Sequence, residues 1–83
     1  MYEAVFLNVF LQRFKKLPED IKERIAKVTE ELMENPYLGL KLRGELADFW
    51  KIRIGKYRLI YRINEEERKI IFCDVDLRKR VYG

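Results

Sequence analysis

The sequence predicts one two-layer α+β domain over residues 1–83, with an N-terminal strand, a helix hairpin and then a three-stranded antiparallel meander. The hydrophobic period changes once, from helical spacing before residue 37 to strand alternation after residue 48. Eighty-three residues are also too few for two independent hydrophobic cores. We expect the N-terminal strand to join the meander in a four-stranded sheet, with the helices on one face.

The first half of the chain is read as a strand followed by two helices. Residues 2–7 form the expected strand, and Asn8 is the expected N-cap of a first helix that ends at about Lys16. Pro18 suits the first position of the second helix, because the missing amide hydrogen costs nothing there. Asn35-Pro36 is expected to end this helix, whose predicted buried stripe consists of Ile21, Ile25, Val28 and Leu32.

The second half of the chain is read as a loop followed by three strands. Residues 37–48 are the expected loop. In residues 49–54, apolar side chains alternate with Lys51 and Arg53, so the first strand of the meander has an apolar inner face and a cationic outer face. The remaining expected elements are a turn at Gly55-Lys56, strands at 57–63 and 69–75, and a polar loop at 64–68.

Composition excludes several classes of protein. The longest apolar runs have four residues, whereas a membrane-spanning helix needs roughly 20. With Cys73 as the one cysteine and no histidine, the chain cannot form an internal disulfide or a structural zinc site. We therefore expect a cytoplasmic protein with no membrane partner, metal or small-molecule cofactor. Any acid–base chemistry must use Lys, Tyr, Arg or carboxylate side chains.

The positive charge is concentrated in the second half of the chain. Residues 41–83 hold twelve Lys and Arg against seven Asp and Glu, whereas residues 1–40 hold six against seven. A polyanion would therefore meet the protein through its C-terminal half. A basic composition alone leaves open whether this serves nucleic-acid binding or only solubility.

Strand alternation places several cations on the outer face of the sheet. Lys51 and Arg53 are expected to lie about 7 Å apart there, and Arg58 follows just across the Gly55 turn. No acid is evident on that face to neutralise them, so a phosphate backbone would supply the counter-charge. The alternative interpretation is the solvated side of an ordinary sheet. If the tail folds back, three further residues join the set, namely Arg78, Arg80 and Tyr82.

Aromatic residues on the inward positions are read as core. Trp50 falls on the inner face of the first meander strand, and Phe10 and Phe14 lie four apart on one helical face. We therefore expect these rings to pack in the interior, and we do not expect them to stack on bases.

Two motifs resemble the RelE/ParE toxin superfamily. They are W-K-I-R-I-G-x-Y-R-L-I-Y, within residues 42–63, and the ending Arg78-Lys79-Arg80-Val81-Tyr82. The resemblance covers nearly the whole chain and is greatest to the RelE branch. It implies a toxin of a type II toxin–antitoxin pair that enters the ribosomal A site and cleaves mRNA. The implied partners are a cognate RelB-like antitoxin, the ribosome and mRNA.

The resemblance also implies the functional residues. The catalytic positions of the family fall on Lys51, Arg53, Arg58, Arg78 and Tyr82, and Lys56, Lys79 and Arg80 are candidate RNA-binding residues.

Each of these residue types suits a step of phosphoryl transfer. Arg58 suits charge stabilisation, because guanidinium donates to phosphate in a bidentate way. Lys51 is the better candidate base, because a crowded positive patch disfavours its charged form. Arg53 cannot act as a base and is expected to orient phosphate. Tyr82 could stack on a base or exchange a proton, and Arg78 could assist the leaving group.

One departure from the family leaves other functions open. Many relatives have a histidine before the arginine of the terminal motif, whereas this chain has Leu77, so a mechanism that uses this histidine is unavailable. The alternatives are a ParE-like inhibitor of DNA gyrase and a catalytically degenerate RNA-binding module. Retention of Lys51, Arg58 and Tyr82 together favours the nuclease, since a protein-binding toxin has no need of that set.

Overall fold

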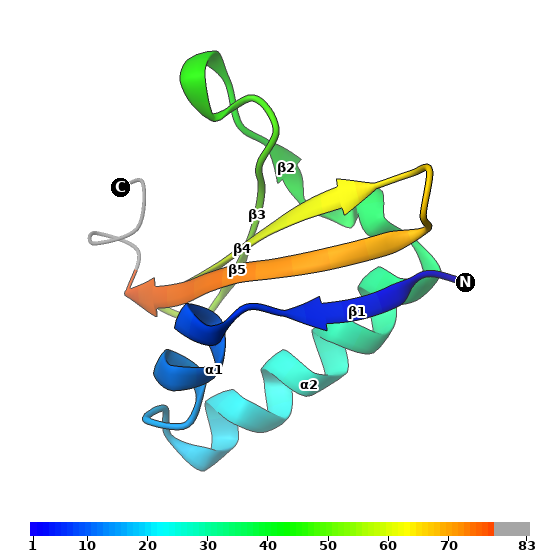
Figure 1. The fold of residues 1–83 in the computed structure, drawn as a ribbon. Coiled ribbons are helices and arrows are strands. Elements are labelled where there is room, and N and C mark those ends of the chain that lie inside the picture. The colour runs from blue at the N-terminus through cyan, green and yellow to red at the C-terminus, as the bar shows by residue number, and fades with distance from the viewer. Residues whose placement is uncertain (78–83) are drawn as a thin grey trace.

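A computed structural model describes residues 1–77 and shows the α+β fold that the sequence predicts (Figure 1). Two short 3₁₀ turns accompany the main elements. In chain order the main elements are β1 (Glu3–Phe6), α1 (Asn8–Phe14), α2 (Glu19–Glu34), β2 (Leu40–Lys41), β3 (Trp50–Ile54), β4 (Tyr57–Asn64) and β5 (Lys69–Leu77).

Over residues 1–77 the sheet has five strands in the order β1-β5-β4-β3-β2, so the prediction of four strands was wrong. The additional strand is β2, which lies in the segment expected to be a loop and pairs antiparallel with β3. It has two residues, too few to show any alternation. The N-terminal strand joins the meander as predicted, with β1 parallel to β5, while β3, β4 and β5 are antiparallel.

Both helices begin one residue away from the predicted positions. Leu7, not Asn8, occupies the cap position of α1, and among residues 1–77 no side-chain hydrogen bond caps the start of this helix. Pro18 is the cap residue of α2 and precedes its first turn, in which Glu19 and Asp20 place negative charge at the positive end of the helix dipole.

The buried stripe of α2 differs from the prediction at one position. Ile21, Ile25 and Leu32 are buried as predicted, but Thr29 is buried where Val28 was expected, and Val28 is only half-buried. The Thr29 hydroxyl donates a hydrogen bond of 2.8 Å to the carbonyl of Ile25. This bond allows a polar residue to occupy a core position of a helix.

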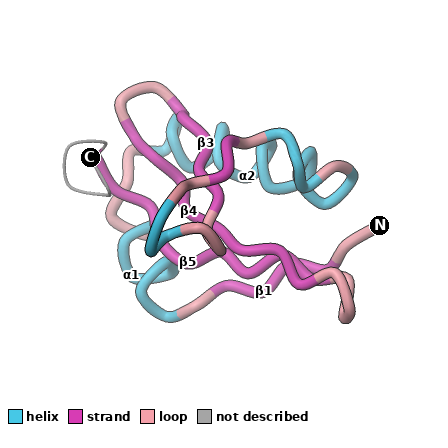
Figure 2. The backbone as a smooth tube through the Cα atoms, turned by 90° about the horizontal axis from the view of Figure 1, so that it is seen from above, coloured by secondary structure: helices cyan, strands magenta, loops and turns pink. Residues whose placement is uncertain are grey.

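The helices lie on one side of the sheet, and α1 packs against β5 (Figures 1 and 2). Aromatic rings fill the interior between the two layers. The Phe72 ring is fully buried, with its centroid 5.9 Å from that of Phe10 and 6.1 Å from that of Tyr61. The prediction of core rings is confirmed, since Phe10 is buried and Phe14 and Trp50 pack against the same cluster.

A buried tyrosine fixes the segment before β2 against the sheet. The Tyr61 hydroxyl donates to the Pro36 carbonyl at 2.8 Å and accepts from the Gly39 amide at 3.1 Å. Gly39 has no space for a side chain, because an added Cβ would lie 2.5 Å from the Lys51 carbonyl oxygen and 2.6 Å from the Tyr61 hydroxyl. Tyr61 therefore holds the backbone at Gly39 directly against β3.

Tyr61 is expected to make the folded protein sensitive to alkali. Burial raises the pKa of Tyr61 to about 12, whereas an unfolded tyrosine titrates near 10. The unfolded chain therefore loses its proton first, and the stabilising effect of Tyr61, complete below pH 10, falls as the pH rises toward 12. We expect wild type to lose about 2 kcal/mol more free energy of unfolding over this range than Tyr61→Phe does.

Urea denaturation at stepped pH values measures this difference. Tyr37→Phe is the control, because the Tyr37 side chain is half-exposed. Parallel alkaline stability curves for wild type and Tyr61→Phe would contradict the assignment.

Candidate functional site

Three of the predicted site residues line one hollow of about 240 Å³ beside the β2 edge of the sheet. Lys51 and Arg53 come from β3 and Arg58 from β4, and the remaining lining residues are Leu38, Gly39, Leu40 and Ile52. The segment with Leu38, Gly39 and Leu40 forms one wall of the hollow, and the hydrogen bonds of Tyr61 hold this segment against the sheet. The hollow thus combines a cationic wall with an apolar one.

A short turn sets the register that brings these cations together. Gly55 has a φ of 62° and Lys56 has no positive φ, which is the pattern of a two-residue type II′ hairpin turn. The turn pairs Arg53 directly with Arg58. Cross-strand partners project from the same face of a sheet, so the expectation that Arg58 lies beside Lys51 and Arg53 is confirmed.

The three cations differ in exposure. Arg58 is buried, with 8% of its surface exposed, while Lys51 is half-buried and Arg53 is exposed. Ile60, the cross-strand partner of Lys51, is fully buried although it lies outside the helix-covered core cluster. This face is therefore not a uniformly solvated sheet surface. Burial restricts the rotamers that the Arg58 side chain can adopt.

The expectation that no acid lies on this face was wrong. The register places Asp76 of β5 opposite Arg58 and Asp74 opposite Ile60. The alternation of the two aspartates was visible in the sequence, but their alignment with β4 also depends on a register shift at Ile60/Tyr61, which has no sequence signal.

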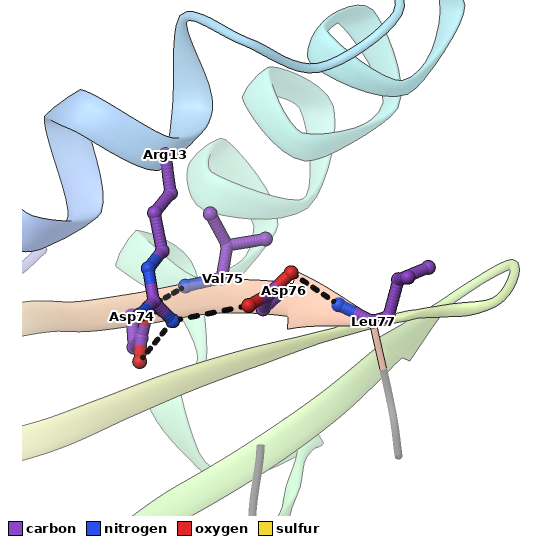
Figure 3. Close-up of polar contacts among 5 residues, drawn as sticks. All are labelled: Arg13, Asp74, Val75, Asp76 and Leu77. Carbon is purple, nitrogen blue, oxygen red and sulfur yellow. Dashed lines mark hydrogen bonds and ion pairs between the residues drawn. The ribbon is translucent and has the colours of Figure 1, made fainter. Parts of the chain in front are cut away.

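Both aspartates bond to an arginine of α1 that the sequence analysis did not identify. The Arg13 Nη1 atom donates to the Asp74 carboxylate at 3.0 and 3.1 Å and to Asp76 Oδ2 at 3.2 Å (Figure 3). No local pattern predicts this contact, because 61 and 63 residues separate the partners.

The remaining predicted residues lie at the end of the β3–β4 hairpin and in the tail. Lys56 is exposed in the hairpin turn. Leu77, at the place of the family histidine, is the last residue of β5. The predicted residues Arg78, Lys79, Arg80 and Tyr82 lie outside the described part of the chain.

Within residues 1–77, no group of three or more His, Cys, Asp and Glu side chains is placed to hold a metal ion. No helix in this part of the chain is long and apolar enough to cross a membrane.

Comparison with known proteins identifies relatives over almost the whole chain. Residues 5–82 match the family described as "ParE toxin of type II toxin-antitoxin system, parDE". The chain is 35% identical to Toxin RelG of Mycobacterium tuberculosis over 86 residues, covering 98% of this chain and 95% of RelG. It is 32% identical to the mRNA interferase toxin RelE of Escherichia coli over 73 residues, covering 84% and 76% of the two chains.

A solved structure shares the fold. The match is to a chain of the toxin–antitoxin complex RelBE2 from Mycobacterium tuberculosis, with a TM-score of 0.85 and 33% identity, covering 93% of this chain and 98% of that one. The fold, the family match and the sequence relatives agree, and the chain therefore belongs to the RelE/ParE toxin family of type II toxin–antitoxin systems.

Proposed function

We propose that this protein is a ribosome-dependent mRNA endoribonuclease that inhibits translation. The observation that carries the proposal is the hollow lined by Lys51, Arg53 and Arg58, three cations around a space that can accept a phosphate. A relative of the chain bears the name mRNA interferase toxin RelE.

The proposed reaction is an internal transesterification of RNA. The ribose 2′-oxygen attacks the adjacent phosphorus, a new 2′-O–P bond forms, and the bond from phosphorus to the 5′-oxygen breaks. The products are a cyclic 2′,3′-phosphate and a 5′-hydroxyl. The reaction needs a base for the 2′-hydroxyl proton, cations for the charge that develops on the phosphoryl oxygens, and an acid for the leaving oxygen.

The residues around the hollow divide these tasks by chemistry and exposure. Arg58 stabilises the phosphoryl charge, because it is buried and its planar guanidinium can donate to two phosphate oxygens at once. Lys51 takes the proton, because an amine can act as a base whereas the guanidinium groups of Arg53 and Arg58 cannot. Arg53 is exposed and orients the incoming phosphate.

Family resemblance assigns the remaining tasks to the tail. Arg78 assists the leaving group, and Tyr82 stacks on a base or exchanges a proton. Lys56, Lys79 and Arg80 bind the RNA backbone through charge. Leu77 cannot contribute an acid, so the leaving oxygen takes its proton from another group.

A cleavage assay on programmed ribosomes tests the proposal. We expect the purified protein to cut a defined mRNA and Lys51→Ala to cut it about 10²- to 10⁴-fold more slowly. Lys27→Ala is the control, because it removes one exposed cation from α2, away from the hollow. Absence of cleavage by wild type, or equal rates for the two variants, would overturn the proposal.

A gyrase inhibitor is the second candidate, because the matched family description names ParE. A supercoiling assay with purified gyrase separates the two functions. Inhibition of gyrase together with intact mRNA would establish the ParE-like activity. RNA binding without cleavage and without gyrase inhibition would instead identify a degenerate RNA-binding module.

We further propose that a RelB-like antitoxin neutralises the toxin in the cytoplasm, where ribosomes and mRNA are present. The solved relative in a toxin–antitoxin complex supports this partner. An acidic segment of the antitoxin would complement the basic half of the chain. Co-expression with the product of the adjacent gene should restore growth and yield a complex on purification, and failure of both results would contradict the pairing.

A further inference from the structure

We propose that Arg13 is a positioning residue, which holds the Asp74 and Asp76 carboxylates at the α1 side of β5 so that they do not neutralise Arg58. The inference rests on the proposed function for the role of Arg58 in binding phosphate. Arg13 would thus be a residue of the N-terminal half that supports a site whose cations all come from the C-terminal half.

The contacts around Arg13 show how the carboxylates are held. The Arg13 side chain extends from α1 to lie between the two aspartates (Figure 3). Asp74 Oδ1 also accepts from the Val75 amide, and Asp76 Oδ1 from the Leu77 amide, each at 2.8 Å. Each carboxylate thus binds both Arg13 and the amide of the following residue.

The end of β1 explains why these amides are available. The pairing of β1 with β5 ends at Phe6 and Phe72, and the described sheet has no strand beside the rest of β5 on that side. The aspartates bond the amides that face this open edge, and α1 packs against β5. Arg13 can therefore reach both carboxylates from α1.

Without Arg13, the carboxylate of Asp76 has a second cation within reach. Asp76 and Arg58 are direct cross-strand partners, and such pairs have Cβ atoms about 5 Å apart. Rotation of the Asp76 side chain toward β4 would form an ion pair with Arg58. A carboxylate in that place competes with phosphate for the guanidinium and repels the RNA backbone.

The binding of a non-cleavable, 2′-O-methylated RNA oligonucleotide tests this role through fluorescence anisotropy. We expect Arg13→Ala to weaken binding about three- to tenfold. Asp76→Asn, placed in the Arg13→Ala background, should restore the affinity to within about twofold of the Asp76→Asn single variant, because the competing charge is gone. Arg13→Lys, which keeps the cation, should bind more tightly than Arg13→Ala.

Lys15→Ala provides the matched control. It removes an exposed cation that follows the same helix but has no contact with either aspartate among the ion pairs of residues 1–77. If Arg13→Ala binds RNA like Lys15→Ala, or if Asp76→Asn fails to rescue it, the inference is wrong. A merely structural role predicts no rescue, since the double variant lacks the ion pair as well.

Two outcomes separate this inference from the proposed function. Rescue of binding in a protein that cuts no mRNA would support the Arg13 role and reject the nuclease. Cleavage by wild type, combined with independent effects of the two substitutions, would support the nuclease and reject the Arg13 role. A crystal structure of Arg13→Ala provides a direct check, and an Asp76 carboxylate that still points away from Arg58 would overturn the inference.

Discussion

Arg58→Ala is expected to slow mRNA cleavage on programmed ribosomes by about 10²- to 10³-fold. This is the usual effect of removing one fixed hydrogen-bond donor that stabilises the negative charge of a transition state. Arg58 is the buried cation of the hollow, so its donors are already held in place when RNA arrives. Arg53, its cross-strand neighbour, is exposed and cannot replace a fixed guanidinium. Single-turnover rates at saturating protein measure the loss.

Two further variants show whether the effect belongs to Arg58 itself. Arg58→Lys keeps the charge but loses the planar pair of donors, so its rate should fall between those of wild type and Arg58→Ala. Arg62→Ala removes an exposed cation from the same face of β4, where Arg62 lies over the Phe49 ring. Circular dichroism confirms that each variant is folded. Equal losses in Arg58→Ala and Arg62→Ala would indicate a general charge effect and reject the assigned role.

Phe72→Ala is expected to lower the free energy of unfolding by about 3–5 kcal/mol, the cost of removing a fully buried aromatic ring. The Phe72 ring contacts aromatic rings from β1, α1 and β4, so the resulting cavity would lie where the two layers meet. For a domain of this size the melting temperature should fall by more than about 12 °C. Urea denaturation and thermal unfolding measure both quantities.

Phe6→Ala is the matched control for this prediction. Its ring is stacked on Phe72 with centroids 5.1 Å apart, but 39% of its surface is exposed. Truncation of Phe6 should therefore cost less than half as much as truncation of Phe72. Equal costs would show that the aromatic cluster is stabilised mainly by ring stacking and not by burial.

The cationic side of the site could be predicted from sequence because its geometry is local. Alternation over five residues puts Lys51 and Arg53 on one face, and a two-residue turn brings Arg58 beside them. The apolar wall could not be predicted, because β2 is too short to show a period and its position depends on Tyr61, which is distant in sequence. Asp76 and Arg13 were missed for the same reason, as a register shift and a helix position decide where they lie.

Within the helices, hydrophobic period was a better guide than capping residues. Ile21, Ile25 and Leu32 follow the buried face of α2 because burial depends on the geometry of the whole helix. The assignment of Asn8 as a cap depended on one side chain, and the described part of the chain provides no side-chain cap at that end of α1. Thr29 could be buried because its hydroxyl has a backbone acceptor in the preceding turn.

The Tyr61 phenol connects the hydrophobic interior to the wall of the hollow through the backbone at Pro36 and Gly39. Altered packing around this ring would therefore shift Leu38 and Leu40 relative to Lys51 without changing a single charge. A genetic screen for substitutions that abolish toxicity should consequently recover uncharged positions such as Gly39 and Tyr61. These would appear alongside the cationic positions Lys51, Arg53 and Arg58.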